Sequence, residues 1–154
     1  YGWEKLISER LCAHYKEDYG IETRTVRFHN IFGENGTWEG GREKAPAALC
    51  RKIAMAKLSE SPEIEIWGDG EQTRSFCYIS DCVEGIYRLM RSDFSEPLNL
   101  GGLLYFLFFG LGFGWLLGWE PAVSLEEGLT ATYRWIESQV REKLSKDEEL
   151  AASA

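Results

Sequence analysis

Tyr1 and Lys5 are the first residues whose types and spacing could carry chemistry. They stand four positions apart, so on a helix the phenol and the ammonium lie on one face. A nearby cation favours the phenolate form of tyrosine, which gives the pair the chemistry of a general base. A solvated helix face is the alternative interpretation of the same two residues.

A second polar cluster, residues 27–30 (RFHN), ends a β-rich segment. Asn30, at the end of the expected strand, could hydrogen-bond a ligand. The alternative is an asparagine that satisfies its own turn, which is common for this residue type. His29 fits a structural role better than a catalytic one.

The third cluster is GGREKAP at residues 40–46. Its two glycines let the backbone approach a ligand closely, and the helix expected from Pro46 offers free N–H groups and a positive dipole to a phosphate. Glu43, Lys44 and Ala45 lie at this point, and Lys52 follows two turns into the helix. A flexible surface loop with solvated charges is the alternative.

The fourth cluster, WGDGEQTRSF, covers residues 67–76. A tight turn is followed by Gln72, Thr73 and Arg74 at the start of an expected strand. A guanidinium is well shaped to bind a phosphate through two parallel hydrogen bonds. A purely structural hairpin is the alternative.

Hydrophobic periodicity predicts the elements that must position these clusters. The expected helices are 1–19, 46–58, 81–91 and 124–144. Gly20 ends the first, Ser80 and Asp81 cap the third, and a capping box of Ser124 and Glu127 opens the last. The expected strands are 22–28, 63–67, 74–79 and 97–100, with a loop at 29–45 and a fraying tail at 145–154. Alternating helices and strands predict an α/β layer structure.

Composition limits the classes of partner. The chain has 154 residues, with 25 acidic against 17 basic side chains and a net charge of −8, which opposes binding to nucleic acid and anionic membranes. Four cysteines without a C-x-x-C pair, and only two histidines, argue against a zinc site, and we expect no metal. The spacings suggest no disulfide framework and the sequence has no signal peptide, so a reducing, cytoplasmic compartment is expected.

Residues 103–119 are an atypical apolar stretch within a window, 100–119, that carries no charge over 20 residues. A membrane span, a buried or interface segment, and a join at which other sequence was lost are the three interpretations. The six glycines of the window and its acidic flanks weaken the membrane interpretation. The spacing of Gly110, Gly112 and Gly114 imitates a dinucleotide fingerprint, but Pro121 cuts short the helix that such a loop requires.

Taken in order, Tyr1-x-x-x-Lys5, RFHN, GGREKAP and WGDGEQTRSF resemble the extended short-chain dehydrogenase/reductases of the NAD-dependent epimerase/dehydratase family. The runs 28–52 and 67–76 resemble its GDP-mannose 3,5-epimerases in particular. The resemblance implies the C-terminal portion of that fold, a partial Rossmann sheet with a substrate-binding subdomain, over residues 1–144.

The resemblance also implies roles for individual residues. Tyr1 would be the base at the sugar 4-hydroxyl, Lys5 would hold the nicotinamide ribose, and Lys44 would exchange the protons beside the transient ketone. Substrate contacts would come from Asn30, Glu43, Lys44, Ala45, Lys52, Gln72, Thr73 and Arg74. The implied cofactor of the complete enzyme is NAD, the implied substrate is a GDP-sugar, and the implied assembly is a homodimer.

Several family features are missing from these residues. They include the glycine-rich dinucleotide loop, the cysteine partner of the lysine, the serine or threonine that accompanies the tyrosine, and an arginine-bearing loop between Gly101 and Leu117. We therefore expect an isomerase-derived chain that is inactive by itself. A nucleotide-sugar 4-epimerase or 4,6-dehydratase, a non-catalytic interaction fragment, and a membrane-tethered segment remain alternatives, and Lys44 argues against a simple 4-epimerase.

Overall fold

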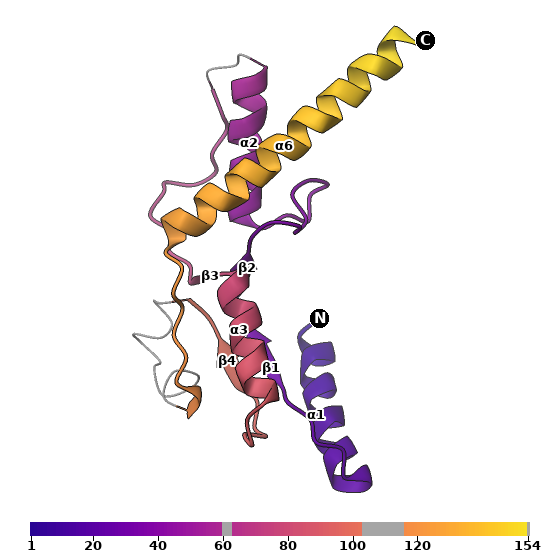
Figure 1. Ribbon diagram of the computed structural model, residues 1–154, viewed down its shortest axis with the longest axis vertical. Coiled ribbons are helices and arrows are strands. Elements are labelled where there is room, and N and C mark those ends of the chain that lie inside the picture. Colours follow the sequence, from indigo (N-terminus) through magenta and orange to yellow (C-terminus); the bar gives the residue numbers. More distant parts are fainter. Residues whose placement is uncertain (60–62, 103–115, 154) are drawn as a thin grey trace.

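The computed structural model describes residues 1–59, 63–102 and 116–153 as an α/β arrangement (Figure 1). The fold class expected from the sequence is therefore confirmed. The helices are α1 (Gly2–Tyr19), α2 (Ala45–Leu58), α3 (Ile79–Met90) and α6 (Leu125–Ala152). The strands are β1 (Val26–Phe28), β2 (Asn30–Phe32), β3 (Phe76–Tyr78) and β4 (Leu98–Leu100).

The strands form two parallel pairs, β1 with β4 and β2 with β3. Only His29 separates β1 from β2, and its N–H donates to the carbonyl of Leu100, 2.9 Å away. The chain therefore passes from pairing with β4 to pairing with β3 within a single residue. The loop expected over 29–45 is wrong in its first part, because β2 gains its hydrogen-bond partners from β3, which lies far along the sequence.

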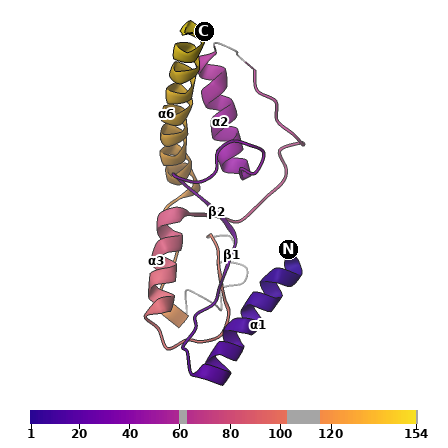
Figure 2. The same cartoon turned by 90° about the vertical axis from the view of Figure 1, so that its right-hand side faces the viewer.

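Two cores hold the described elements together. One lies around β1, β3, β4 and α3, and its buried members are Cys77, Cys82, Leu89, Leu98, Leu100 and Trp119. The other lies between α2 and α6 and is made of Cys50, Ala54, Ile136 and Val140. Both views show α2 and α6 packed side by side, at the end of the molecule away from α1 (Figures 1 and 2).

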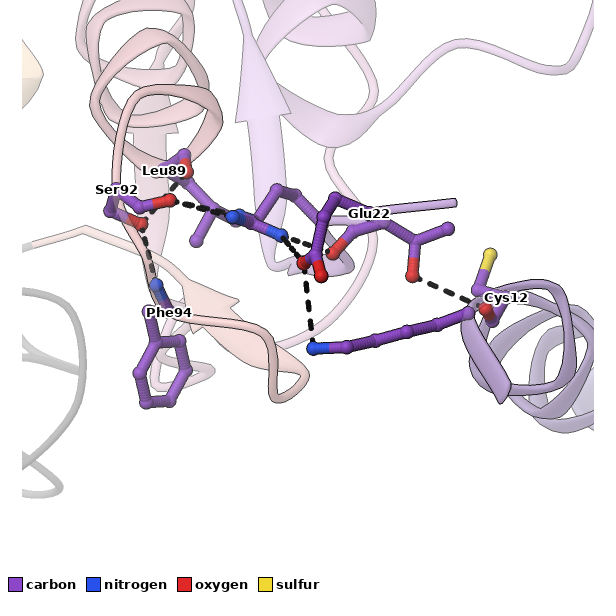
Figure 3. Close-up of polar contacts among 8 residues, drawn as sticks. Cys12, Glu22, Leu89, Ser92 and Phe94 are labelled. Atoms are coloured by element: carbon purple, nitrogen blue, oxygen red, sulfur yellow. Dashed lines mark hydrogen bonds and ion pairs between the residues drawn. The ribbon is translucent and has the colours of Figure 1, made fainter. Parts of the chain in front are cut away.

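Helix α1 ends as the sequence predicts, because Gly20 adopts a left-handed conformation with φ of 68°. A polar network around Arg24 then fastens this end of the helix (Figure 3). The Arg24 guanidinium donates from Nε and Nη2 to the carbonyl of Ser92, at 3.0 and 2.9 Å, and from Nη1 to Glu22. Glu22 also pairs with Lys16 of α1 at 3.4 Å, so the network joins α1 to the turn between α3 and β4.

Helix α6 begins with the expected capping box. The Ser124 hydroxyl accepts from the N–H of Glu127 at 3.2 Å, and the Glu127 carboxylate accepts from the N–H of Ser124 at 3.0 Å. The helix continues to Ala152, past residue 144, where we expected fraying to begin. Residues 141–153 are exposed, so this end is stabilised by local pairs such as that of Lys146 with Glu142 at 2.6 Å.

Two local expectations are wrong. Helix α3 begins at Ile79 after Tyr78, without a side-chain cap, and Asp81 is instead buried, where it accepts from the N–H of Val123 at 3.0 Å. Residues 63–67 alternate like a strand but are irregular, because no strand of the described residues pairs with them. Alternation marks a segment as suitable for a sheet, and only a neighbouring strand makes it one.

Most of the apolar stretch, residues 103–115, lies outside the described residues, and so do Gly110, Gly112 and Gly114. Among the helices that are described, none combines the length and the apolar character needed to cross a bilayer.

Candidate functional site

Tyr1 and Lys5 lie together at the start of α1. The Lys5 Nζ atom is 5.0 Å from the centre of the Tyr1 ring, as the helical spacing predicts. Both residues line a cavity of about 620 Å³ whose opposite wall includes Val26 and Phe28 of β1. This cavity is open at Tyr1, whose side chain is exposed.

The first two turns of α1 are fixed to β1 by an ion pair. The Arg27 guanidinium donates from Nε and Nη2 to the two carboxylate oxygens of Glu9, at 2.6 and 2.5 Å. The hydrogen bond from Arg27 lowers the pKa of Glu9, although partial burial opposes the shift. Because Glu9 lies one turn beyond Lys5, the ion pair between Arg27 and Glu9 holds the Tyr1–Lys5 pair beside β1.

Asn30 opens β2 and reaches the fourth cluster. Its side-chain amide donates to the carbonyl of Ser75 at 3.1 Å, and in the strand pairing Asn30 lies opposite Phe76. The amide therefore fastens a distant segment rather than its own turn. Because Ser75 directly follows Arg74 in the chain, this hydrogen bond also brings Asn30 near the backbone of Arg74.

The turn at residues 67–76 is organised by Asp69. Gly68 and Gly70 both have positive φ, and Asp69 Oδ1 accepts from the N–H of Glu71 at 3.0 Å and from the Gln72 side-chain amide at 2.9 Å. Gln72 is thus engaged within the turn. Arg74 donates to the carbonyl of Thr73 at 2.7 Å and lines a cavity of about 360 Å³ between β3 and residues 121–125.

Lys44 sits at the N-terminus of α2. Its backbone is extended and its carbonyl accepts from the N–H of Ala48 at 2.9 Å, so the helix starts at Ala45, one residue before the expected Pro46. No side chain caps this terminus, and its N–H groups are available to an anion. The exposed Lys44 side chain lies beside them.

The side chain of Glu43, directly before Lys44, is buried, with 7% of its surface exposed. Its Oε1 atom accepts from Arg51 at 2.9 Å, whereas Oε2 is buried and has no hydrogen-bond partner within the described ranges. The backbone N–H of Glu43 itself and then the Arg51 guanidinium lower the pKa of this carboxyl. Oε2 accepts no hydrogen bond from that N–H or from the N–H of Gly41.

Lys52 joins the third and fourth clusters. Its ammonium donates to the carbonyl of Glu65 at 2.6 Å and lies 5.8 Å from the centre of the Trp67 ring. Segment 63–67 is therefore held to α2 by this lysine, not by strand pairing.

The candidate residues thus form three local groups: Tyr1 with Lys5, Asn30 with the segment 72–75, and residues 43–45 with Lys52. In the part of the chain that is described, no hydrogen bond or ion pair connects Lys44 with Tyr1 or Lys5. Figure 2 places the N-terminal end of α1 and the segment 63–75 on the same side of β1 and β2. No group of His, Cys, Asp or Glu suited to a metal ion occurs among the residues described.

Two polar contacts escaped the sequence analysis. Arg51 binds Glu43 and the carbonyl of Trp38 together. The Tyr78 hydroxyl donates to Glu34 at 2.5 Å, and burial, followed by this carboxylate, raises the pKa of Tyr78 to about 12. Only the opposite charges of Arg51 and Glu43 hinted at the first contact, and nothing in the sequence pairs Tyr78 with Glu34.

The parallel strand pairs and the helices beside them define a partial α/β fold. Residues 1–101 match the NAD dependent epimerase/dehydratase family, and the chain belongs to that family. Solved structures agree with this fold. The UDP-glucose 4-epimerase of Thermotoga maritima superposes with a TM-score of 0.73 at 24% identity, over 91% of this chain and 54% of that one. The UDP-glucuronic acid 4-epimerase of Bacillus cereus, solved with NAD, gives 0.70 at 26% identity, over 89% and 50%.

Within the family, the chain is similar to GDP-mannose 3,5-epimerases. It is 42% identical to that enzyme of Arabidopsis thaliana, over 98% of this chain and 47% of the relative. UDP-glucuronic acid decarboxylase 1 of Xenopus tropicalis is 31% identical, over 88% of this chain and 38% of the relative. The chain thus spans about half the length of the curated relatives it matches. The Arabidopsis alignment covers 182 positions, more than the 154 residues here, so that relative has residues which this chain lacks.

Proposed function

We propose that this chain is the substrate-side portion of a nucleotide-sugar epimerase that acts on a GDP-sugar in the manner of the GDP-mannose 3,5-epimerases, with NAD as cofactor of the complete protein. The identity of 42% over nearly the whole chain supports this substrate class. The observation that carries the proposal is the pair Glu43–Lys44, a buried carboxylate with one unpartnered oxygen next to an exposed amine at a helix N-terminus.

Tyr1 and Lys5 suit the first half of the reaction. When bound, NAD would supply reversible hydride transfer at C4 of the sugar. The Tyr1 side-chain oxygen would accept the proton of the 4-hydroxyl, and the Lys5 ammonium can hold the ribose hydroxyls of the cofactor. The cavity of about 620 Å³ beside this pair supports its access to both molecules.

Glu43 and Lys44 suit the second half. A ketone at C4 acidifies the hydrogens on C3 and C5, and an amine held beside it can remove and return those protons. A buried carboxylate oxygen is rarely left without a donor, and a sugar hydroxyl would supply one to Glu43 Oε2. Such a contact would put the sugar ring next to Lys44.

The remaining candidates suit the diphosphate and the rest of the substrate. The free N–H groups of α2 at Ala45, together with Arg74 and Lys52, offer donors to phosphate oxygens. Three polar candidates lie near Arg74 in the fold: Gln72 and Thr73 directly precede it, and Asn30 binds the carbonyl of Ser75, which follows it. The GDP-sugar is the partner this set of donors fits.

A 4-epimerase is the second candidate, since solved structures of such enzymes share the fold. Inversion at C4 alone requires no base for a carbon-bound proton. The two candidate functions therefore differ in whether Lys44 must act as a base: the 3,5-epimerase requires one, and the 4-epimerase does not.

Substitution of Lys44 tests the proposal in the protein that includes the NAD-binding half. A single general acid or base contributes about 10²- to 10⁴-fold. Lys44→Ala should reduce deuterium incorporation at C3 and C5 of GDP-mannose by about that factor, while transient reduction of NAD persists. Lys44→Arg should not restore exchange, because a guanidinium stays protonated.

Tyr1→Phe provides the contrast, since it should abolish NAD reduction and exchange together. Proton NMR of the sugar and nicotinamide absorbance measure the two signals on the same sample. Equal loss of both signals in Lys44→Ala would mean that Lys44 only binds substrate, and unchanged exchange would mean that another group is the base. Absence of exchange at C3 and C5 in the unmodified protein, with NAD reduction intact, would favour the 4-epimerase.

A further inference from the structure

The loop between β2 and α2 presents Glu43 and Lys44. Tyr78 and Lys143 bind its first part, through Glu34 and Glu39, but the double glycine separates those contacts from Lys44. Residues 33–44 contain no helix or strand, and Gly40 and Gly41 follow each other with φ of 91° and 79°. Two successive glycines in this region give the chain conformational freedom rather than rigidity. A residue outside the loop must therefore restrain it if Lys44 is to occupy one place.

Arg51, in the second turn of α2, makes that connection at two points. Its Nε donates to the carbonyl of Trp38 at 3.1 Å, and its Nη2 donates to Glu43 Oε1 at 2.9 Å. Trp38 and Glu43 stand on either side of the double glycine, so one guanidinium joins both limbs of the turn to the helix that follows. A planar guanidinium, whose donors have a fixed spacing, is well suited to bind two such acceptors at once.

The surroundings make this contact stronger than an ordinary surface ion pair. The side chains of Arg51 and Glu43 are 25% and 7% exposed, so water screens their attraction only weakly. Removal of the guanidinium would leave a buried carboxylate without its partner. The loop would then lose the anchor on both sides of the glycines.

We propose that Arg51 is a positioning residue, which fixes the loop 33–44 and thereby presents Glu43 and Lys44 to the substrate. The proposal rests on the proposed function, because it assumes that these two residues meet a GDP-sugar. Its structural half, the restraint of the loop, can be measured on this chain without any turnover.

Hydrogen exchange of the chain measures that restraint. In Arg51→Ala, the amides of residues 33–44 should exchange about 10- to 100-fold faster, the range expected for hydrogen bonds to a charged group, while those of α6 stay unchanged. Ethylguanidinium should slow the exchange again, and ethylammonium at the same concentration should not. Arg10→Gln, which removes an exposed ion pair of α1 with Glu17, is the matched control and should leave residues 33–44 unaffected.

Unchanged exchange in 33–44, equal acceleration in α6, or rescue by ethylammonium would overturn the positioning role. If Arg51→Ala does not fold, Arg51→Lys replaces it, because lysine is shorter and lacks the two spaced nitrogens that reach Trp38 and Glu43. GDP-mannose provides the second arm and should slow exchange of 33–44 in the unmodified chain and in Arg10→Gln, but not in Arg51→Ala. Equal protection of Arg51→Ala would overturn the inference, whereas absence of protection in the unmodified chain would count against the proposed function alone.

Discussion

Glu137 is the residue on which the contact between α2 and α6 depends electrostatically. It accepts from Arg141 of its own helix at 2.6 Å and from Lys57 of α2 at 3.0 Å. These two hydrogen bonds, that of Arg141 first, lower the pKa of Glu137 to about 2. The shift means that the folded state favours the ionised carboxylate more than the unfolded chain does.

This pKa predicts how stability changes with pH. A carboxyl whose pKa is depressed on folding stabilises the protein above its unfolded value, 4.5, and loses that contribution as pH falls toward 2. Glu137→Gln should therefore lower the urea midpoint at neutral pH, and the difference from the unmodified chain should shrink steadily below pH 4.5. Urea unfolding followed by circular dichroism at several pH values measures this.

Glu148→Gln is the control for this prediction, because it removes a carboxylate from the exposed end of the same helix. It should leave the urea midpoint unchanged at every pH. A difference for Glu137→Gln that stayed constant from pH 7 to pH 2 would mean that the variant loses packing rather than charge.

At the scale of elements, α6 lies on the β2–β3 pair because Gly128 has no side chain. A Cβ at this position would stand 2.9 Å from Phe32 Cζ and 2.9 Å from Tyr78 Cδ2. The two rings also pack on each other, with centres 5.6 Å apart, so neither can move away freely. The close approach of helix and strands therefore requires glycine here.

Gly128→Ala should destabilise the protein by about 1–3 kcal/mol, the usual range for an overpacked site. Helix propensity alone predicts the opposite sign, a gain of about 1 kcal/mol. Gly2→Ala in α1 is the control, since nothing lies within 4 Å of its added Cβ, and it should not destabilise. Free energies of unfolding from urea titrations decide the matter, and a stabilised Gly128→Ala would contradict the packing argument.

The capping box gives a second prediction for α6. Ser124→Ala removes the acceptor for the N–H of Glu127 and should cost about 1 kcal/mol of unfolding free energy. Ser138→Ala, whose hydroxyl only bonds back to the carbonyl of Trp135, should cost less. Equal losses in the two variants, compared by thermal or urea unfolding, would show that the cap contributes nothing special.

At the scale of the whole molecule, α1 has no buried residue. Its apolar side chains, among them Trp3, Leu6, Ile7 and Leu11, are each more than half exposed. Monomeric proteins rarely expose apolar patches beyond a few hundred square ångströms. The described chain thus leaves one complete helix face without a covering surface.

We expect the chain to associate through this face. Sedimentation velocity should give a mass that rises with concentration, and Trp3→Glu with Ile7→Glu should reduce association. Met90→Glu, at an exposed apolar residue of α3, is the control and should not. A monomer at all concentrations, or equal effects of both sets of changes, would contradict the expectation.

Several elements were predictable because their causes are local. Gly20 ends α1, and Ser124 with Glu127 opens α6, through hydrogen bonds within a few residues. The Tyr1–Lys5 contact follows from helical spacing alone. In each case the interacting groups are neighbours in the chain, so sequence distance and spatial distance agree.

Other features could not be predicted, because their partners are remote. Asn30 becomes the start of a strand through its pairing with Phe76, and residues 63–67 lack any such partner. Asp81 looked like a helix cap, but the N–H of Val123 takes up its carboxylate inside the fold. The role of Arg51 likewise depends on where a glycine-rich loop returns to its helix.

Residue types and spacing by themselves determined the α/β class, the end of α1 at Gly20, the start of α6 at Ser124 and the candidate chemistry of Tyr1, Lys5 and Lys44. These features depend on short-range backbone hydrogen bonding and on intrinsic side-chain chemistry. The tertiary structure alone decided which strands pair, that Glu43 is buried with one oxygen unpartnered, and that Arg51 holds both limbs of its loop. Burial and the pairing of remote groups arise only when the chain has folded, since they depend on which segments exclude water from each other.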